Sequence, residues 1–135
     1  ARKNPQTGMP MKLTEIIPII KGKVLNPKVN LDIEIKGAGG ADLMSDVLAS
    51  LQPQAVLLSG LCNPQVVRTA MMADVVAIIL VRGKTPPIET ISLAETEHIP
   101  LISTPFGMFQ ACGLLYQAGL ACLEYPVSDQ DCFAE

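Results

Sequence analysis

An uninterrupted run of seven apolar residues, Val75–Val81, limits what this chain can fold into more than any other feature. A membrane helix needs about 20 apolar residues, so this run is too short to cross a bilayer. A strand with one wet face would alternate apolar and polar residues, and this run does not alternate. It therefore predicts a strand that is covered on both faces. Two shorter segments, Ala55–Leu58 and Pro100–Ser103, predict further short strands.

Segments with helical spacing separate these predicted strands. Leu43, Val47 and Leu51 would share one face of a helix, and Asn63 followed by Pro64 is a favourable helix start. Strands that alternate with helices build right-handed βαβ units. We therefore expect an α/β fold, a single compact domain with a mainly parallel central sheet and helices packed on it. The predicted helices after residue 40 span residues 41–51, 64–73, 87–97 and 106–119.

The first third of the chain carries shorter signals. Helical spacing predicts a helix over Met11–Ile20, although this segment contains Pro18, and Lys23–Leu25 is typical of a short strand. Residues 29–36 alternate apolar and polar side chains, which predicts a half-buried strand. Gly37–Gly40 predicts a flexible loop. The expected organisation is a flexible N-terminal lead over 1–10, the α/β domain over 11–120 and a mixed acidic C-terminal tail over 121–135.

Composition argues against several classes of function. The 135 residues carry a formal net charge of −3 and include two Tyr, three Phe and no Trp, so the chain lacks the basic surface and the stacking platforms that nucleic acids need. No apolar segment has the length of a membrane span, and the first eight residues hold no apolar run. We expect a cytoplasmic protein with no nucleic-acid partner and no membrane partner.

The cysteines give no metal spacing, because none of them forms a CxxC pair. A domain of this size does not need disulfides, so we expect free thiols in a reducing compartment. The sequence predicts no metal site and leaves any cofactor unknown. The four cysteines are Cys62, Cys112, Cys122 and Cys132.

Two glycine motifs fall short of nucleotide-binding fingerprints. The Gly83-Lys84-Thr85 segment matches the end of a P-loop, but that pattern needs a glycine where this chain has Ile78. Gly37–Gly40 begins a GxGxxG pattern that Asp42 interrupts. An acid at that position would stabilise the start of its own helix and compete with a phosphate. Neither motif therefore predicts a P-loop or a dinucleotide site.

Polar residues and glycines lie where the predicted strands end, which is where α/β sheets bind ligands. Arg82 and Lys84 would oppose an anionic group. Asp42, Ser45 and Asp46 would bind polar parts of the ligand or close an interface. The candidate ligand-binding residues are Gly39, Gly40, Asp42, Ser45, Asp46, Ser59, Gly60, Asn63, Arg82, Gly83, Lys84, Ser103 and Thr104.

A catalytic role has weaker support in the sequence. His98 is the only histidine, and Cys62 or Ser103 could be paired with it as a nucleophile. No nucleophile elbow surrounds either residue. We therefore expect no enzyme and no catalytic residue, and a Cys62- or Ser103-dependent enzyme is the least favoured alternative.

Several segments resemble the DRTGG-domain family over roughly residues 11–120. The most specific is Gly39–Ala49, in which an acid-Leu-Met-Ser-Asp helix follows a glycine stretch. The chain departs from the family pattern at Val81-Arg82-Gly83, where Thr-Gly-Gly is usual, and at Ser59–Pro64, which replaces an Asp-Arg element. The other segments that fit the family are Val76–Gly83, Thr90–Glu97, Ile99–Thr104, Phe109, Gly113–Tyr116 and Gly119–Leu120.

The resemblance implies a stand-alone relative of the HPr kinase/phosphorylase N-terminal domain, with the α/β fold of that domain. Domains of this family are regulatory or structural rather than catalytic, and they tend to form dimers or larger assemblies. We therefore expect a non-catalytic regulatory domain that self-associates as a homodimer and senses a small anionic ligand such as a nucleotide. The alternative is a pure protein–protein interaction module that docks a partner enzyme or kinase.

Overall fold

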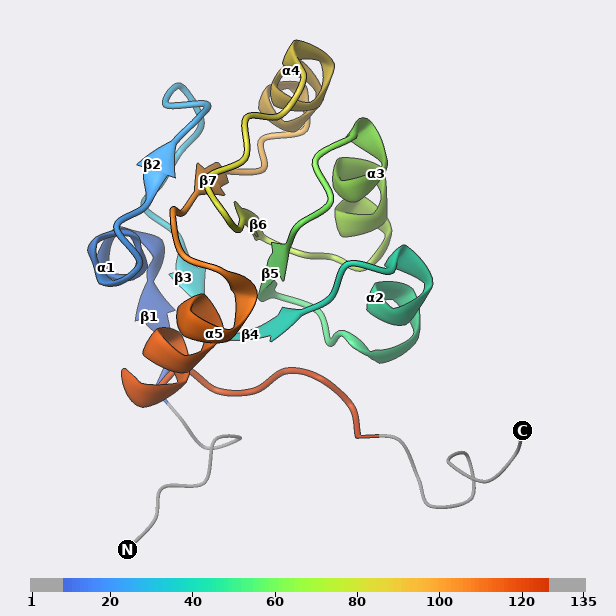
Figure 1. The fold of residues 1–135 in the computed structure, drawn as a ribbon. Coiled ribbons are helices and arrows are strands. Elements are labelled where there is room, and N and C mark those ends of the chain that lie inside the picture. Colours follow the sequence, from blue (N-terminus) through green and yellow to red (C-terminus); the bar gives the residue numbers. More distant parts are fainter. Residues whose placement is uncertain (1–8, 127–135) are drawn as a thin grey trace, which may run out of the picture.

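Four parallel strands form the centre of the computed structural model, which describes residues 9–126 (Figure 1). Residues 1–8 of the predicted lead lie outside the described residues, and so do residues 127–135, which include the acidic end of the predicted tail. The elements along the chain are β1 (Met11–Lys12), α1 (Leu13–Ile19), β2 (Lys23–Val24), β3 (Glu34–Ile35), β4 (Gly37–Gly40), α2 (Met44–Ser50), β5 (Ala55–Ser59), α3 (Pro64–Met72), β6 (Ala77–Leu80), α4 (Ile88–Thr96), β7 (Leu101–Ser103) and α5 (Met108–Gln117).

The main sheet has five strands in the order β2-β7-β6-β5-β4. Strands β4, β5, β6 and β7 are parallel neighbours, and β2 pairs with β7 in the antiparallel direction. Every residue of β5 and β6 is buried. The mainly parallel sheet predicted from the apolar runs is therefore confirmed. Strands β1 and β3 form a separate antiparallel pair.

Helices cover both faces of this sheet, because alternate side chains of a strand point to opposite sides. Val56 and Ile79 belong to the core under α1 and α5, whereas Leu57 and Ile78 belong to the core under α2, α3 and α4. Figure 1 shows α2, α3 and α4 on one side of the sheet and α1 and α5 on the other. This division follows from the right-handed crossovers. Since α2, α3 and α4 each connect one parallel strand to the next in the same direction across the sheet, all three lie on the same face.

The glycine segment Gly37–Gly40 is strand β4, so the prediction of a flexible loop is wrong. It pairs in register with Ala55–Leu58. Glycine has no side chain to reveal a strand pattern and a low strand propensity, so only pairing with β5 makes this segment a strand. A Cβ at Gly39 would collide with Leu51 Cδ1 and lie 2.8 Å from Glu124 Cγ. The missing side chain thus lets neighbouring segments close on the strand.

The chain after α5 runs along the outer edge of β4. The Ala38 N–H donates to the Ala121 oxygen at 2.9 Å, and the Leu123 N–H donates to the Ala38 oxygen at 2.9 Å. Glu124 Oε2 then accepts the Gly40 N–H at 2.7 Å. These bonds occupy an edge that would otherwise present unpaired backbone groups. Residues 121–125, with which the predicted tail begins, therefore pair with the sheet.

Three predicted boundaries in the first half of the chain differ from the structure. The alternating segment 29–36 contributes only β3, because its partner β1 is two residues long. The first helix starts at Leu13 rather than Met11, because Met11 and Lys12 form β1. The helix predicted over 41–51 starts at Met44, since Asp42 is held outside it by the bond described below.

Replacement of Ile79 tests the position of β6 in the core, because Ile79 is fully buried. Ile79→Ala should lower the free energy of unfolding by about 2–5 kcal/mol, since the loss of a buried aliphatic side chain leaves a cavity. Ile88→Ala is the control: Ile88 is 68% exposed, and its loss should cost no more than about 0.5 kcal/mol. Urea titrations measure both. Equal stabilities of the two variants would contradict this core.

Candidate functional site

Three of the predicted site residues meet at the carboxyl edge of the sheet. The Gly60 N–H donates to Asp42 Oδ1 at 2.6 Å, and Lys84 Nζ donates to the Gly60 oxygen at 2.6 Å. The peptide groups around Gly60 thus join a carboxylate from the β4–α2 connection to an ammonium from the β6–α4 connection. Asp42 and Lys84 remain exposed, so both can contact a ligand. The expectation that Asp42 stabilises the start of α2 is wrong, because it lies before the helix.

Glycine suits position 60 because the two polar side chains close over it. A Cβ built there would lie 3.2 Å from Asp42 Oδ1 and 3.5 Å from Lys84 Nζ. A larger side chain would have to displace one of them. The local sequence therefore allows an acid and a base from two different connections to bind the backbone of the same glycine.

The turn after β6 holds Arg82 in the left-handed region, with a φ of 69°. Three other non-glycine residues with positive φ directly follow helix ends, where this conformation is common, and they are Lys21, Asp74 and His98. Arg82 instead follows a strand. Its N–H donates to the Phe106 oxygen at 2.7 Å, and the Gly83 N–H donates to the Thr104 oxygen at 2.7 Å. These bonds to the β7–α5 connection offset a backbone strain of about 1–3 kcal/mol.

An open depression of about 690 Å³ lies between Arg82 and the first turn of α5. Gly107 is the N-cap of α5 and offers no side chain to the first N–H groups. Such groups have no intrahelical acceptor and carry partial positive charge. Together with the exposed guanidinium of Arg82, they favour a negatively charged group. The volume falls in the range of about 300–1,000 Å³ that small-molecule sites occupy.

Three other predicted site residues use their polar atoms within the fold. Ser59 is buried, and its Oγ accepts the N–H two residues later at 3.1 Å. Thr104 is also buried, and its Oγ1 donates to the Ile20 oxygen at 2.6 Å. Asn63 accepts the Gln65 N–H at 3.0 Å and thereby caps α3. These interactions account for the three side chains without a ligand.

The remaining predicted residues lie at separate places. Ser103 Oγ is 3.5 Å from the Lys84 oxygen, at the rim of the carboxyl edge. Ser45 and Asp46 are exposed on α2, and neither side chain is hydrogen-bonded to Asp42 or Gly60. Gly39 and Gly40 belong to β4. The structure thus brings Asp42, Gly60, Lys84 and the neighbouring Arg82–Gly83 turn together and distributes the rest over its surroundings.

The paired nucleophile and base of the enzyme alternative lie at opposite edges of the sheet. His98 precedes the amino end of β7, whereas Cys62 and Ser103 lie at the carboxyl ends of β5 and β7. His98 therefore cannot act as a base for either residue. Burial raises the pKa of the Cys62 thiol, and Lys84 offsets this only in part. A thiol with a raised pKa is not an activated nucleophile.

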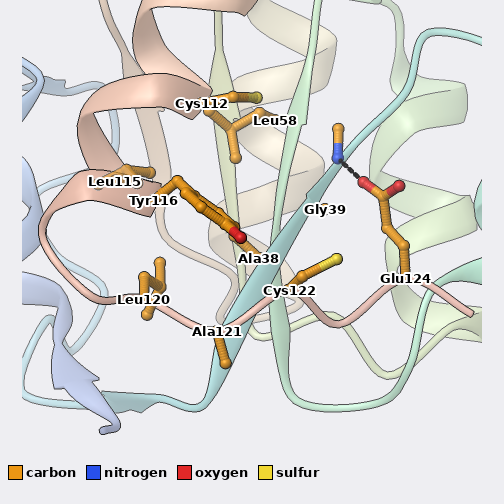
Figure 2. Close-up of a pocket in the computed structure, with 11 residues that line it drawn as sticks. Ala38, Gly39, Leu58, Cys112, Leu115, Tyr116, Leu120, Ala121, Cys122 and Glu124 are labelled. Atoms are coloured by element: carbon orange, nitrogen blue, oxygen red, sulfur yellow. Dashed lines mark hydrogen bonds between the residues drawn. The ribbon is translucent and has the colours of Figure 1, made fainter. Parts of the chain in front are cut away.

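A second, smaller cavity of about 130 Å³ lies between α5, β4 and the segment after α5 (Figure 2). Its volume is below the range typical of small-molecule sites, so it is not a nucleotide site. The carboxylate of Glu124 stands at its rim, bonded to Gly40. Burial raises the pKa of the Cys112 thiol, and Glu124 acts in the same direction. The lining residues are Ala38, Gly39, Gly40, Leu58, Cys112, Leu115, Tyr116, Leu120, Ala121, Cys122 and Glu124.

The sequence pattern does not predict this cavity. Its floor is β4, which was predicted as a loop, and one wall is the segment 120–124, most of which was predicted as a tail. The available signal was the spacing of Cys112 and Tyr116, four residues apart in α5. Cys112 lines both this cavity and the depression beside Arg82, so the two spaces share a wall.

Neither a metal cluster nor a membrane span is found within residues 9–126. No three His, Cys, Asp or Glu side chains in that range lie close enough to hold a metal ion. No helix in it is both long and apolar enough to cross a bilayer. Cys62, Cys112 and Cys122 are free thiols, and Cys132 lies outside the described residues.

Comparison with known proteins shows the fold but not the family. No family model and no curated protein matches the sequence. Among solved structures, the chain is similar to the CBS and DRTGG domains of the regulatory region of Clostridium perfringens pyrophosphatase, complexed with its activator diadenosine tetraphosphate. The TM-score is 0.60 at 16% identity, over 93% of this chain and 53% of that chain. The chain thus spans about half the length of that structure and shares an α/β fold found in an enzyme's regulatory region.

The Asp42–Gly60 bond can be tested through stability. Asp42→Ala should lower the free energy of unfolding by about 1 kcal/mol, because the Gly60 N–H loses a charged acceptor. Asp46→Ala is the matched control, since Asp46 is also exposed and its carboxylate does not bind Gly60. Urea titrations compare the two variants. An effect of Asp46→Ala as large as that of Asp42→Ala would contradict the role of this bond.

Raised thiol pKa values predict slow alkylation at neutral pH. Cys62 and Cys112 keep their protons in the native state at pH values where unfolded thiols ionise. Below the pKa of an ordinary thiol, the two cysteines therefore leave the free energy of unfolding unchanged. As the pH rises from that pKa to the higher pKa of the native thiols, the free energy of unfolding falls. Iodoacetamide labelling followed by mass spectrometry should show native Cys62 and Cys112 reacting more slowly than the same residues in the denatured chain. Equal rates at neutral pH would contradict the burial effect.

Proposed function

We propose that this chain is a non-catalytic regulatory domain that binds a small anionic ligand such as a nucleotide and that also self-associates. The observation that carries the ligand proposal is the placement of Arg82 against the uncapped first turn of α5, in a depression of about 690 Å³. The exposed guanidinium and the first N–H groups of α5, which have no intrahelical acceptor, are donors that suit phosphate oxygens.

The charge at the carboxyl edge supports an anion more than a cation. Lys84 lies two residues after Arg82, and its ammonium is already fixed by the Gly60 oxygen. Asp42, which accepts the Gly60 N–H, balances part of this charge and offers a carboxylate to ribose or base hydroxyl and amino groups. A nucleotide presents both kinds of group, so the arrangement suits its phosphate and its neutral part.

The structural neighbour supports a regulatory role over a catalytic one. That protein's matching part belongs to a regulatory region, and its activator is a nucleotide. For this chain we infer membership of the DRTGG family and action on a partner enzyme, with the ligand as the signal. The separation of His98 from Cys62 and Ser103 supports the assignment of no catalytic residue.

Thermal shift with the full chain tests ligand binding. ATP or diadenosine tetraphosphate should raise Tm, because a ligand that binds only the folded state stabilises it. Arg82→Ala should reduce the shift by at least half, and added salt should weaken it by screening. Arg68→Ala is the matched control, an exposed arginine on α3, and should keep the wild-type shift.

Two results would refute the proposed ligand site. The first is no rise in Tm with any adenine or guanine nucleotide at low salt. The second is a rise that Arg82→Ala leaves unchanged, which would place the nucleotide elsewhere on the chain. A lower Tm of Arg82→Ala without nucleotide does not affect this test, because each variant is judged by the rise in Tm that the nucleotide causes.

A further inference from the structure

The outward face of α5 is an uncharged helical surface. Met108–Gln117 contains no Asp, Glu, Lys or Arg, whereas each of the other four helices in the described part of the chain contains at least one. The exposed residues of α5 fall at the spacing of one helix face. They are Phe109, Gln110, Gly113, Tyr116 and Gln117.

Two aromatic side chains on this face are open to solvent. Phe109 is 93% exposed and Tyr116 is 49% exposed. Exposed apolar patches mark interaction sites, and the centres of interfaces are rich in aromatic residues and poor in charged ones. The composition of the face therefore matches an interface rather than a solvated surface.

Gly113 stands at the middle of the face, four residues from both Phe109 and Gln117. Apart from its chain neighbours and the backbone of its own helix, no described atom lies within 4 Å of the position where its Cβ would be, so the space above it is open. Axis separations at helix crossings depend on the side chains at the contact, and a glycine permits the closest approach. A second helix can therefore cross α5 at this residue.

We infer that the α5 helix of a second copy of this chain covers this face, in an antiparallel pair that crosses at Gly113. In a two-fold arrangement the same patch serves both copies. Crossing at Gly113 places Phe109 of each copy against the end of the other helix that carries Tyr116 and Gln117. No like charges meet across the two helices, although each chain carries a net charge of −3. The inference rests on the self-association in the proposed function and names its surface.

The area available is enough for a weak dimer. A buried aromatic side chain covers about 150–250 Å², so the exposed parts of Phe109 and Tyr116 bring roughly 300 Å² per copy. These two residues thus account for about 600 Å² over both copies, and the two glutamines and Gly113 add to it, which places the contact among weak interfaces of less than about 1,200 Å² in total. We expect a dimer that dissociates in the micromolar range or above.

Sedimentation velocity over a concentration series tests this surface. The wild-type chain should pass from its monomer mass of 14.4 kDa towards twice that value as concentration rises. Phe109→Glu should weaken association at least tenfold, and it leaves the helix intact because an acid in the first turn suits the helix dipole. Ile88→Glu is the matched control, an exposed apolar residue in the first turn of α4, and should associate like wild type.

Gly113→Arg is a second variant, outside the depression beside Arg82, and should also abolish the dimer while keeping the nucleotide-induced rise in Tm. A dimer that survives in Phe109→Glu and Gly113→Arg would overturn the α5 surface and leave self-association standing. A wild-type chain that stays monomeric at all concentrations would overturn both the α5 surface and the proposed self-association. The nucleotide-induced shift in Tm is compared between the wild type and Gly113→Arg, because Phe109 lines the depression beside Arg82 and Phe109→Glu would place a negative charge there.

Discussion

Burial of β5 and β6 on both faces is the constraint on which the rest of the structure depends. Neither strand offers a polar side to water, so helices must cover both sides of the sheet. Three crossover helices, α2, α3 and α4, cover one face, and α1 and α5 cover the other. The apolar area buried in this way is the main driving force for folding.

The same parallel arrangement places the candidate site. Every crossover starts at the carboxyl edge, so the connections that hold Asp42, Gly60 and Arg82 are brought to one side of the molecule. Backbone bonds from Arg82 and Gly83 to the β7–α5 connection then fix the turn relative to the first turn of α5. The site is thus a consequence of topology, and its charge comes from the two basic residues after β6.

The α5 helix links the two proposals made for this chain. Its first turn borders the depression beside Arg82, and its outward face carries Phe109 and Gly113. A ligand at one end and a second copy along the face would contact the same ten-residue helix.

The sequence predicted the parts of the fold that depend on side-chain pattern. The runs around β5, β6 and β7 are apolar because both faces are buried, and Asn63-Pro64 marks a helix start that the structure has. Strand β4 could not be predicted in this way, because its glycines and Ala38 carry almost no side-chain pattern and its pairing comes from β5 and residues 121–125. The cavity beside Cys112 was missed for the same reason. Arg82 and Lys84 were identified from their place after a strand, but the role of α5 at the depression needed the β7–α5 connection in three dimensions.

The most direct test of an anion-binding site at the carboxyl edge of the sheet is a titration of the ¹⁵N-labelled full chain with ATP, followed through the amide chemical shifts. If ATP binds at this edge, the amide chemical shifts should change mainly at Gly60, Arg82–Lys84 and Gly107–Gln110. The shifts of residues at the amino edge of the sheet, such as Asp74 and His98, should stay unchanged. Changes confined to the amino edge, or no changes at nucleotide concentrations far above those of the protein, would contradict a ligand site at the carboxyl edge.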